Sequence, residues 1–115
     1  MKVIIGYIDE FKRRAKILRK KYSSFESDYK AFINELKNNP YGGEPLGHHT
    51  YKHRMAIFSK GKGKSGGSRV LTYNVEHLSE DKVIVTLLTI YDKNEISNVS
   101  DSYIKSLVKE MESNL

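Results

Sequence analysis

The start of the chain has the hydrophobic spacing of a short strand followed by a helix. Branched apolar residues dominate Lys2–Ile8, which favours a strand. Over Asp9–Tyr22 the apolar residues recur every three or four positions, which indicates an amphipathic helix. These apolar positions are Phe11, Ala15, Leu18 and Tyr22. Basic residues occupy much of the remaining surface of this predicted helix.

A second helix is predicted directly after the first. Ser23 and Glu26 have the spacing of a capping box, which satisfies the free N–H groups at a helix start. The helix ends before Pro40, because the residue that precedes a proline is disfavoured in the helical conformation. Its expected buried positions are Tyr29, Phe32, Ile33 and Leu36. Two helices joined so closely form an antiparallel hairpin, and the glycine-rich segment Tyr41–His49 that follows is predicted to be a loop.

The rest of the chain is mostly strand. Strands are predicted at Tyr51–Phe58, Arg69–Val75 and Lys82–Tyr91. The first alternates strictly, so Lys52 and Arg54 share one face. The third is apolar on both sides, as a strand covered on both faces should be. The polar segment Glu76–Asp81 joins the last two strands as a hairpin.

The order of elements predicts the fold class. Ser100 is the expected cap of a final helix whose apolar face is Ile104, Leu107, Val108 and Met111. The order is then β-α-α-β-β-β-α, and a run of helices followed by a run of strands is typical of an α+β fold. We expect a helical hairpin packed on a small antiparallel sheet. With 115 residues, the chain is expected to form a single domain over residues 1–115.

Composition limits the possible chemistry and the cellular compartment of the protein. The chain contains no cysteine, which excludes disulfides, thiolate catalysis and zinc–cysteine sites. No apolar run approaches the roughly 18 to 20 residues of a membrane span. The opening apolar stretch Val3–Ile5 is shorter than the core of a signal peptide. We therefore expect a cytoplasmic protein that does not contact the membrane.

The distribution of charge changes this picture more than the net charge of +6 does. No acidic residue lies between Glu44 and Glu76, and a second basic block covers Lys12–Lys21. Positive fields of this kind attract phosphate backbones or acidic protein partners. A solvated helix face and a loop would carry the same charges without any partner.

The segment Ser59–Gly67 alternates lysine and glycine. Its glycines formally match a dinucleotide-binding fingerprint, but that motif requires a following helix and a strand follows here. A phosphate-binding P-loop would require glycine at the position of Phe58. The remaining interpretations are a plain hairpin connection or a flexible loop that follows a phosphate chain. In the second case the phosphate contacts are Lys60, Lys62 and Lys64.

The histidines do not indicate a metal site. His48 and His49 are adjacent, and adjacent residues on a strand point in opposite directions. Glu44 is the only acidic residue near them and His53. We predict no bound metal and no cofactor.

The arrangement that makes chemical sense is cationic. Lys52, Arg54 and Arg69 belong to neighbouring strands, and Tyr91 and Lys93 lie at the end of the last one. Such a site suits attack of an RNA 2′-hydroxyl on the adjacent phosphate, because fixed cations stabilise the charge that develops on the phosphorane. The expected proton carrier is a lysine or tyrosine whose pKa is lowered by neighbouring positive charge.

Several stretches in this order resemble the RelE/ParE superfamily of bacterial toxins of type II toxin–antitoxin systems, in particular its RelE-like and HigB-like mRNA interferases. They are Asn39–Leu46, Tyr51–Arg54, Lys60–Tyr73, Leu88–Glu95 and Val99–Ser100. The resemblance covers nearly the whole chain and implies a microbial-RNase-like fold whose concave sheet face binds mRNA on the ribosome.

The resemblance also implies roles for individual residues. The expected catalytic residues are Lys52, Arg54, Arg69, Tyr91 and Lys93. Tyr91 is a substitute, because the tyrosine that RelE carries in its C-terminal segment would fall near Val99. We expect Lys60, Lys62, Lys64 and Tyr73 to bind RNA, with the lysines positioning the chain and Arg69 acting in catalysis.

The implied partners are mRNA, the ribosome and a cognate antitoxin. We expect the antitoxin to cover the basic helix at Arg13, Arg14 and Lys20, or to add a strand to a sheet edge. The competing interpretations are a ParE-like inhibitor of DNA gyrase and a non-catalytic RNA-binding module. Within this superfamily the cationic cluster favours the ribonuclease branch.

Overall fold

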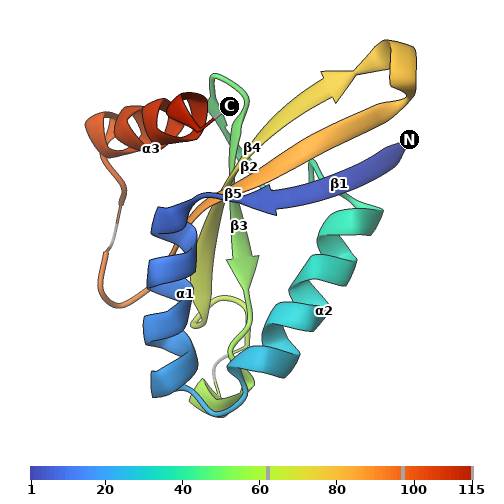
Figure 1. The fold of residues 1–115 in the computed structure, drawn as a ribbon. Coiled ribbons are helices and arrows are strands. Elements are labelled where there is room, and N and C mark those ends of the chain that lie inside the picture. The colour runs from blue at the N-terminus through green and yellow to red at the C-terminus, as the bar shows by residue number, and fades with distance from the viewer. Residues whose placement is uncertain (62, 97, 115) are drawn as a thin grey trace.

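The computed structural model describes residues 1–61, 63–96 and 98–114. The helices are α1 (Asp9–Lys21), α2 (Phe25–Asn38) and α3 (Asp101–Ser113), with 3₁₀ turns η1 (Phe58–Lys60) and η2 (Leu78–Glu80). The strands are β1 (Lys2–Tyr7), β2 (Glu44–Gly47), β3 (Thr50–Met55), β4 (Ser68–His77) and β5 (Lys82–Asp92). The predicted α+β class is confirmed (Figure 1).

One five-stranded sheet has the order β1-β5-β4-β3-β2. It is mixed, so the expectation of an antiparallel sheet is wrong: β1 pairs parallel to β5, with Lys2 opposite Lys82. β1 and β5 are far apart in the sequence, and no hairpin turn forces them to run in opposite directions. The other pairs are antiparallel.

Two hydrophobic clusters cover the two faces of the sheet. On one face α1 and α2 pack with Phe11, Leu18, Phe32 and Leu36 onto Val85 and neighbouring strand residues. On the other face α3 packs with Leu107 against Ile8, Leu71, Leu88 and Tyr91. Figure 1 shows α1 and α2 meeting near residues 22–24 and diverging from there in a V.

Three local predictions are corrected. The capping box is absent: Ser24, rather than Ser23, precedes α2, and its hydroxyl donates to Asp28 at 2.6 Å instead of capping the helix. The predicted loop Tyr41–His49 contains β2, which pairs with β3. The predicted strand Tyr51–Phe58 ends at Met55, and Phe58 begins η1. In contrast, Ser100 caps α3 as expected, by accepting a hydrogen bond from the Tyr103 amide at 3.1 Å.

A β-bulge in β5 decides which residues face which helices. Leu71 pairs with Thr89 while Thr72 pairs with Leu87, so Leu88 is the extra residue. Before the bulge the odd-numbered residues of β5 face α1 and α2, and after it they face the α3 side. Tyr91 therefore lies on the α3 side of the sheet.

Candidate functional site

A row of three side chains crosses the sheet. Arg54 on β3 lies opposite Arg69 on β4, and Arg69 lies opposite Tyr91 on β5. Residues directly opposite each other project from the same face of a sheet, so all three share the α3 side. Lys52, two residues before Arg54, projects from that face as well. The sheet thus brings together four of the five residues that the sequence suggested.

A cleft of about 740 Å³ opens beside this row. β2 ends its pairing with β3 at Lys52, so in the described part of the chain the edge of β3 beyond it has no partner strand. The cleft surrounds this edge and reaches α2. Its lining includes Glu35, Glu44, Lys52, His53, Arg54, Lys64, Arg69, Tyr91, Lys93 and Ile96.

Arg69 is buried, and its guanidinium is already engaged. Nη1 donates to the carbonyl oxygens of Lys64 at 3.2 Å and Ser68 at 3.1 Å, and Nη2 donates to that of Ser65 at 3.0 Å. Burial, and after it the charge of Arg54, lowers the pKa of Arg69. Arg69 therefore holds the end of the lysine–glycine loop in place, a role that sequence reasoning missed. A guanidinium has five N–H groups, and the described residues accept from three of them, which leaves two for a ligand.

Arg54 and Lys93 are the available cations of the cleft. Both are exposed, and neither forms an ion pair with the described residues. The backbone N–H of Lys93 donates to the Gly67 carbonyl at 3.2 Å, which fixes the start of the turn after β5 beside the end of the loop. A phosphate that enters the cleft would meet these two charges without displacing an existing partner.

Two carboxylates line the cleft that sequence reasoning did not place there. Glu44 Oε2 lies 3.1 Å from Lys52 Nζ, and Glu35 Oε2 lies 2.9 Å from Lys64 Nζ. The cleft therefore holds carboxylates beside the predicted cations. Glu35 projects from α2 and Glu44 begins β2, so only the packing of these elements around β3 brings them to the cleft.

Tyr91 differs from the expected proton carrier. Its side chain is buried, and burial raises the pKa of Tyr91, although the charge of Arg69 acts in the opposite direction. The prediction of a phenol with a lowered pKa is wrong for this residue, because desolvation of the phenolate outweighs the neighbouring cation. Tyr91 stays protonated at neutral pH and is a hydrogen-bond donor.

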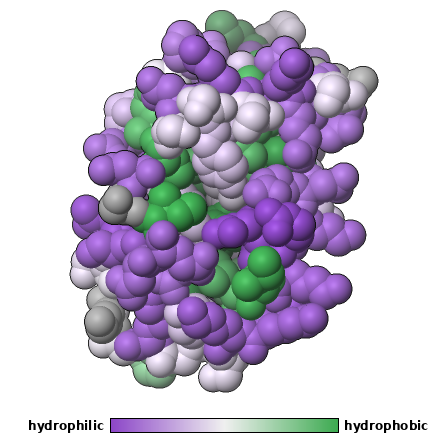
Figure 2. All heavy atoms as spheres, turned by 90° about the vertical axis from the view of Figure 1, so that its left-hand side faces the viewer, coloured by the Kyte–Doolittle hydropathy of each residue, from purple (hydrophilic) through white to green (hydrophobic). Residues whose placement is uncertain are grey.

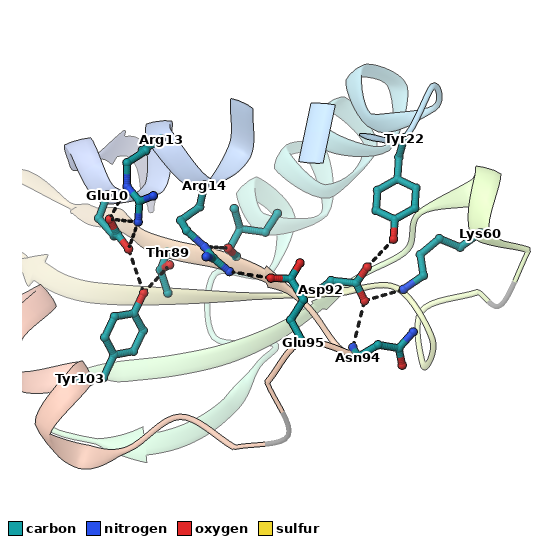
Figure 3. Close-up of polar contacts among 11 residues, drawn as sticks. Glu10, Arg13, Arg14, Tyr22, Lys60, Thr89, Asp92, Asn94, Glu95 and Tyr103 are labelled. Atoms are coloured by element: carbon teal, nitrogen blue, oxygen red, sulfur yellow. Dashed lines mark hydrogen bonds and ion pairs between the residues drawn. The ribbon is translucent and has the colours of Figure 1, made fainter. Parts of the chain in front are cut away.

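Lys60 is not a solvent-exposed loop lysine. Its Nζ lies 2.7 Å from Asp92 Oδ1, and both side chains are buried. Asp92 also accepts hydrogen bonds from the Tyr22 hydroxyl and from the Asn94 amide at 2.9 Å (Figure 3). We expected Lys60 to bind phosphate, and the structure instead uses its charge to compensate the buried carboxylate.

The other residues predicted to bind RNA lie in different places. Lys64 does line it, while Tyr73 lies in a second groove of about 570 Å³ between α3 and the β2–β3 turn. The ring of Tyr73 packs near that of His49, with 5.7 Å between ring centroids. Lys62 lies outside the described residues.

The basic helix α1 is only partly available to a partner. Lys20 is exposed, and Arg13 is exposed but bridges to Glu10 at 2.9 Å. Arg14 is half-buried and donates to the Ile90 carbonyl at 3.2 Å and to Glu95 (Figure 3). The face that includes α1 and α3 is mostly hydrophilic, with small hydrophobic patches between polar side chains (Figure 2).

The fold separates His53 from His48 and His49. His48 and His49 form the tight β2–β3 turn with φ values of 51° and 66°. His53 is buried against Phe32, where its Nε2 lies 3.1 Å from the Thr72 hydroxyl and burial lowers the pKa of His53 to about 4. Among the described residues no three His, Asp or Glu side chains form a metal-binding group.

A scan of the chain against models of known protein families finds no match. Within the described part of the chain, no helix is both long enough and apolar enough to span a membrane.

Proposed function

We propose that this protein is a metal-independent endoribonuclease that cleaves mRNA on the ribosome, as the toxin of a type II toxin–antitoxin pair. The observation that carries the proposal is the row of Arg54, Arg69 and Tyr91 in one cleft with Lys52 and Lys93. The resemblance of the sequence to the RelE/ParE superfamily supports the ribosome as the place of action and an antitoxin as the partner.

The proposed reaction is an internal transesterification. The 2′-oxygen forms a bond to the adjacent phosphorus, and the bond from phosphorus to the 5′-oxygen of the next nucleotide breaks. The products are a 2′,3′-cyclic phosphate and a free 5′-hydroxyl. The 2′-hydroxyl loses its proton to a base, and the leaving 5′-oxygen gains one from an acid.

The cleft offers candidates for each of these roles. Arg54 and the two free N–H groups of Arg69 would hold the non-bridging oxygens, where negative charge develops. Glu44 is the carboxylate closest to this row in strand register, since it pairs with Lys52, and we assign it as the proton acceptor. The exposed ammonium of Lys93 would protonate the leaving oxygen.

The experiment that tests this function is induced expression followed by mapping of mRNA 5′ ends. Cleavage within translated codons that disappears in Arg54→Ala, but not in the matched surface variant Arg19→Ala, supports the proposal. Arg19 is an exposed arginine of α1 outside the cleft. Intact mRNA with double-strand DNA breaks would indicate a gyrase inhibitor instead, and intact mRNA and DNA would indicate a non-catalytic RNA-binding protein.

Purified components separate ribosome-dependent from free cleavage. We expect the protein to cut mRNA on programmed ribosomes much faster than the same mRNA alone, because the ribosome orients the phosphate in the cleft. Glu44→Gln should slow the single-turnover rate, because it removes the proposed proton acceptor. Equal rates on free and ribosome-bound mRNA would contradict the role of the ribosome.

A further inference from the structure

Phe58 is the most exposed of the large hydrophobic side chains in the described part of the chain, with 82% of its surface accessible. It is the first residue of η1, directly before the lysine–glycine loop. Among the described residues from Ala56 to Ser68 it is the only large hydrophobic side chain that is exposed. Exposing a whole aromatic ring to water forgoes the free energy of burying it.

The backbone that carries this ring is held firmly. The Phe58 N–H donates to Asp28 at 2.9 Å, and the Ser59 N–H donates to the Ser24 hydroxyl at 2.9 Å. One residue further on, Lys60 is held by the buried pair with Asp92 (Figure 3). Three consecutive residues are thus fixed by side chains from α2, from Ser24 before it and from β5. A ring on a fixed turn loses little conformational freedom on binding a ligand.

The turn that carries the ring starts beside the end of the candidate cleft, because the Phe58 N–H donates to Asp28. A shallow notch of about 50 Å³ continues the cleft along the edge of β3 and shares Phe32, Glu35, Arg54 and Lys64 with it. The notch ends at Asp28 and Ala56. Asp28 is the residue that holds the Phe58 amide, and Ala56 precedes Phe58 by two residues, a span of at most roughly 7 Å.

The surroundings of Phe58 favour a nucleobase over a protein as its partner. A protein-binding hot spot needs a contiguous apolar patch, whereas Phe58 is followed by Ser59, Lys60 and Gly61, and Ile57 before it is buried. Single-stranded nucleic acid binding needs a cationic track with an aromatic ring on which a base can stack. Among the described residues of the notch, Arg54 is the cation without an ion-pair partner, since Lys64 pairs with Glu35 at 2.9 Å.

We propose that Phe58 is a stacking platform for a base of single-stranded RNA that follows the cleft and its notch past Arg54. This inference rests on the proposed function for its substrate, and it assigns where the RNA leaves the cleft. Phe58 binds the RNA and does not touch the scissile phosphate, so its loss should raise KM and leave the saturated cleavage rate unchanged.

The test uses the absence of tryptophan from the sequence. Phe58→Trp creates a protein with a single tryptophan at the platform, and Leu78→Trp is the matched control. Leu78 is 75% exposed on η2, at the opposite end of the sheet from η1. The probe is a 2′-O-methyl oligoribonucleotide, which cannot be cleaved by 2′-hydroxyl attack. Its abasic counterpart, with the same number of phosphates, is the control ligand.

We expect the base-containing oligomer to quench the tryptophan of Phe58→Trp, and neither the abasic oligomer nor Leu78→Trp to give this effect. In anisotropy titrations at low salt, Phe58→Ala and Phe58→Leu should bind the oligomer roughly 5- to 100-fold more weakly, and Leu78→Ala should bind normally. Phe58→Tyr should retain affinity, because it keeps the aromatic ring.

Several results would overturn the inference. The first is equal quenching of Phe58→Trp and Leu78→Trp by the base-containing oligomer. The second is equal affinity of Phe58→Ala and Leu78→Ala for that oligomer. The third is a Phe58→Ala variant that no longer binds a protein partner but binds the oligomer as the wild type does. The last result would identify a protein-binding surface. Cleavage of unmodified RNA without stacking would reject this inference alone. Stacking without cleavage would reject only the proposed function. A wild-type protein that cleaves mRNA on the ribosome but does not bind the free oligomer would reject the stacking platform and leave the proposed function standing.

Discussion

Arg54 and Arg69 lie directly opposite each other on β3 and β4, with both side chains on the face of the sheet that carries Tyr91. Like charges directly opposite across two strands destabilise a sheet. After burial, Arg54 is the main cause that lowers the pKa of Arg69. A pair that the fold keeps in spite of its electrostatic cost is typical of a site that binds anions.

Removal of Arg54 should separate activity from stability. Arg54→Ala relieves the repulsion, so we expect the free energy of unfolding to be unchanged or to rise by about 0.2 to 1 kcal/mol. Single-turnover cleavage on programmed ribosomes should fall roughly 100-fold, the scale of losing one transition-state donor. Arg69→Ala should instead lower both activity and the resistance of the loop to trypsin at Lys64, since it removes the bonds to the loop carbonyls. Normal cleavage by Arg54→Ala would place the active site elsewhere.

The Lys60–Asp92 pair should be a main contributor to stability. Asp92→Asn leaves the Lys60 ammonium buried without a counter-charge, which costs about 3 to 5 kcal/mol in such pairs. The double variant Lys60→Met/Asp92→Asn should recover most of this loss, because the buried charge is gone. Urea unfolding of the single and double variants gives the coupling energy. The exposed Lys82–Glu80 pair is the control, and Glu80→Gln should unfold at the same urea concentration as the wild type.

Acidification should destabilise the protein through His53. Burial lowers the pKa of His53 to about 4, below its ordinary value of about 6.5, so the unfolded chain binds more protons between these two values. The contribution of neutral His53 to the free energy of unfolding is complete above pH 6.5 and decreases as the pH falls. At pH 5 about 2 kcal/mol of it is lost. Urea unfolding at pH 7 and pH 5 should show this loss in the wild type and in His77→Gln. If His53→Gln loses as much stability between pH 7 and pH 5 as the wild type, another group causes the pH dependence.

Two glycines provide a matched test of close packing. A Cβ at Gly67 would overlap the Met55 carbonyl oxygen and lie 3.0 Å from the Ala56 Cα, and backbone cannot move away as a side chain can. We expect Gly67→Ala to lose at least about 2 kcal/mol of unfolding free energy. A Cβ at Gly6 meets nothing within 4 Å, so Gly6→Ala should be neutral or slightly stabilising. Thermal unfolding of the two variants compares them, and equal midpoints would show that the β3–β4 junction can relax.

The proposed antitoxin interface can be tested at exposed positions of α1. Arg14 is unsuitable because it binds the Ile90 carbonyl and Glu95. Arg13→Glu/Lys20→Glu changes exposed positions only, and we expect weaker antitoxin binding with a smaller salt dependence. Calorimetric titration at two salt concentrations measures both. Unchanged affinity would place the antitoxin on another surface.

Local pattern was sufficient for much of the fold. The helical spacing of Phe11 and Leu18, the serine before α3 and the alternation that places Lys52 and Arg54 on one face are all confirmed. Each depends on residues within a few positions of one another, where the 3.6-residue and two-residue periods decide orientation.

The tertiary structure decided which residues join or leave the cationic site that the sequence suggested. The bulge at Leu88 turns Tyr91 to the face of Arg69, and no local signal in an apolar strand marks where an extra residue is inserted. The packing of α2 and β2 around the edge of β3 adds Glu35 and Glu44 to the cleft. Lys60 pairs with the buried Asp92 and does not line the cleft. Each of these outcomes pairs segments that are distant in the sequence, and burial and charge compensation between such segments depend on the assembled chain.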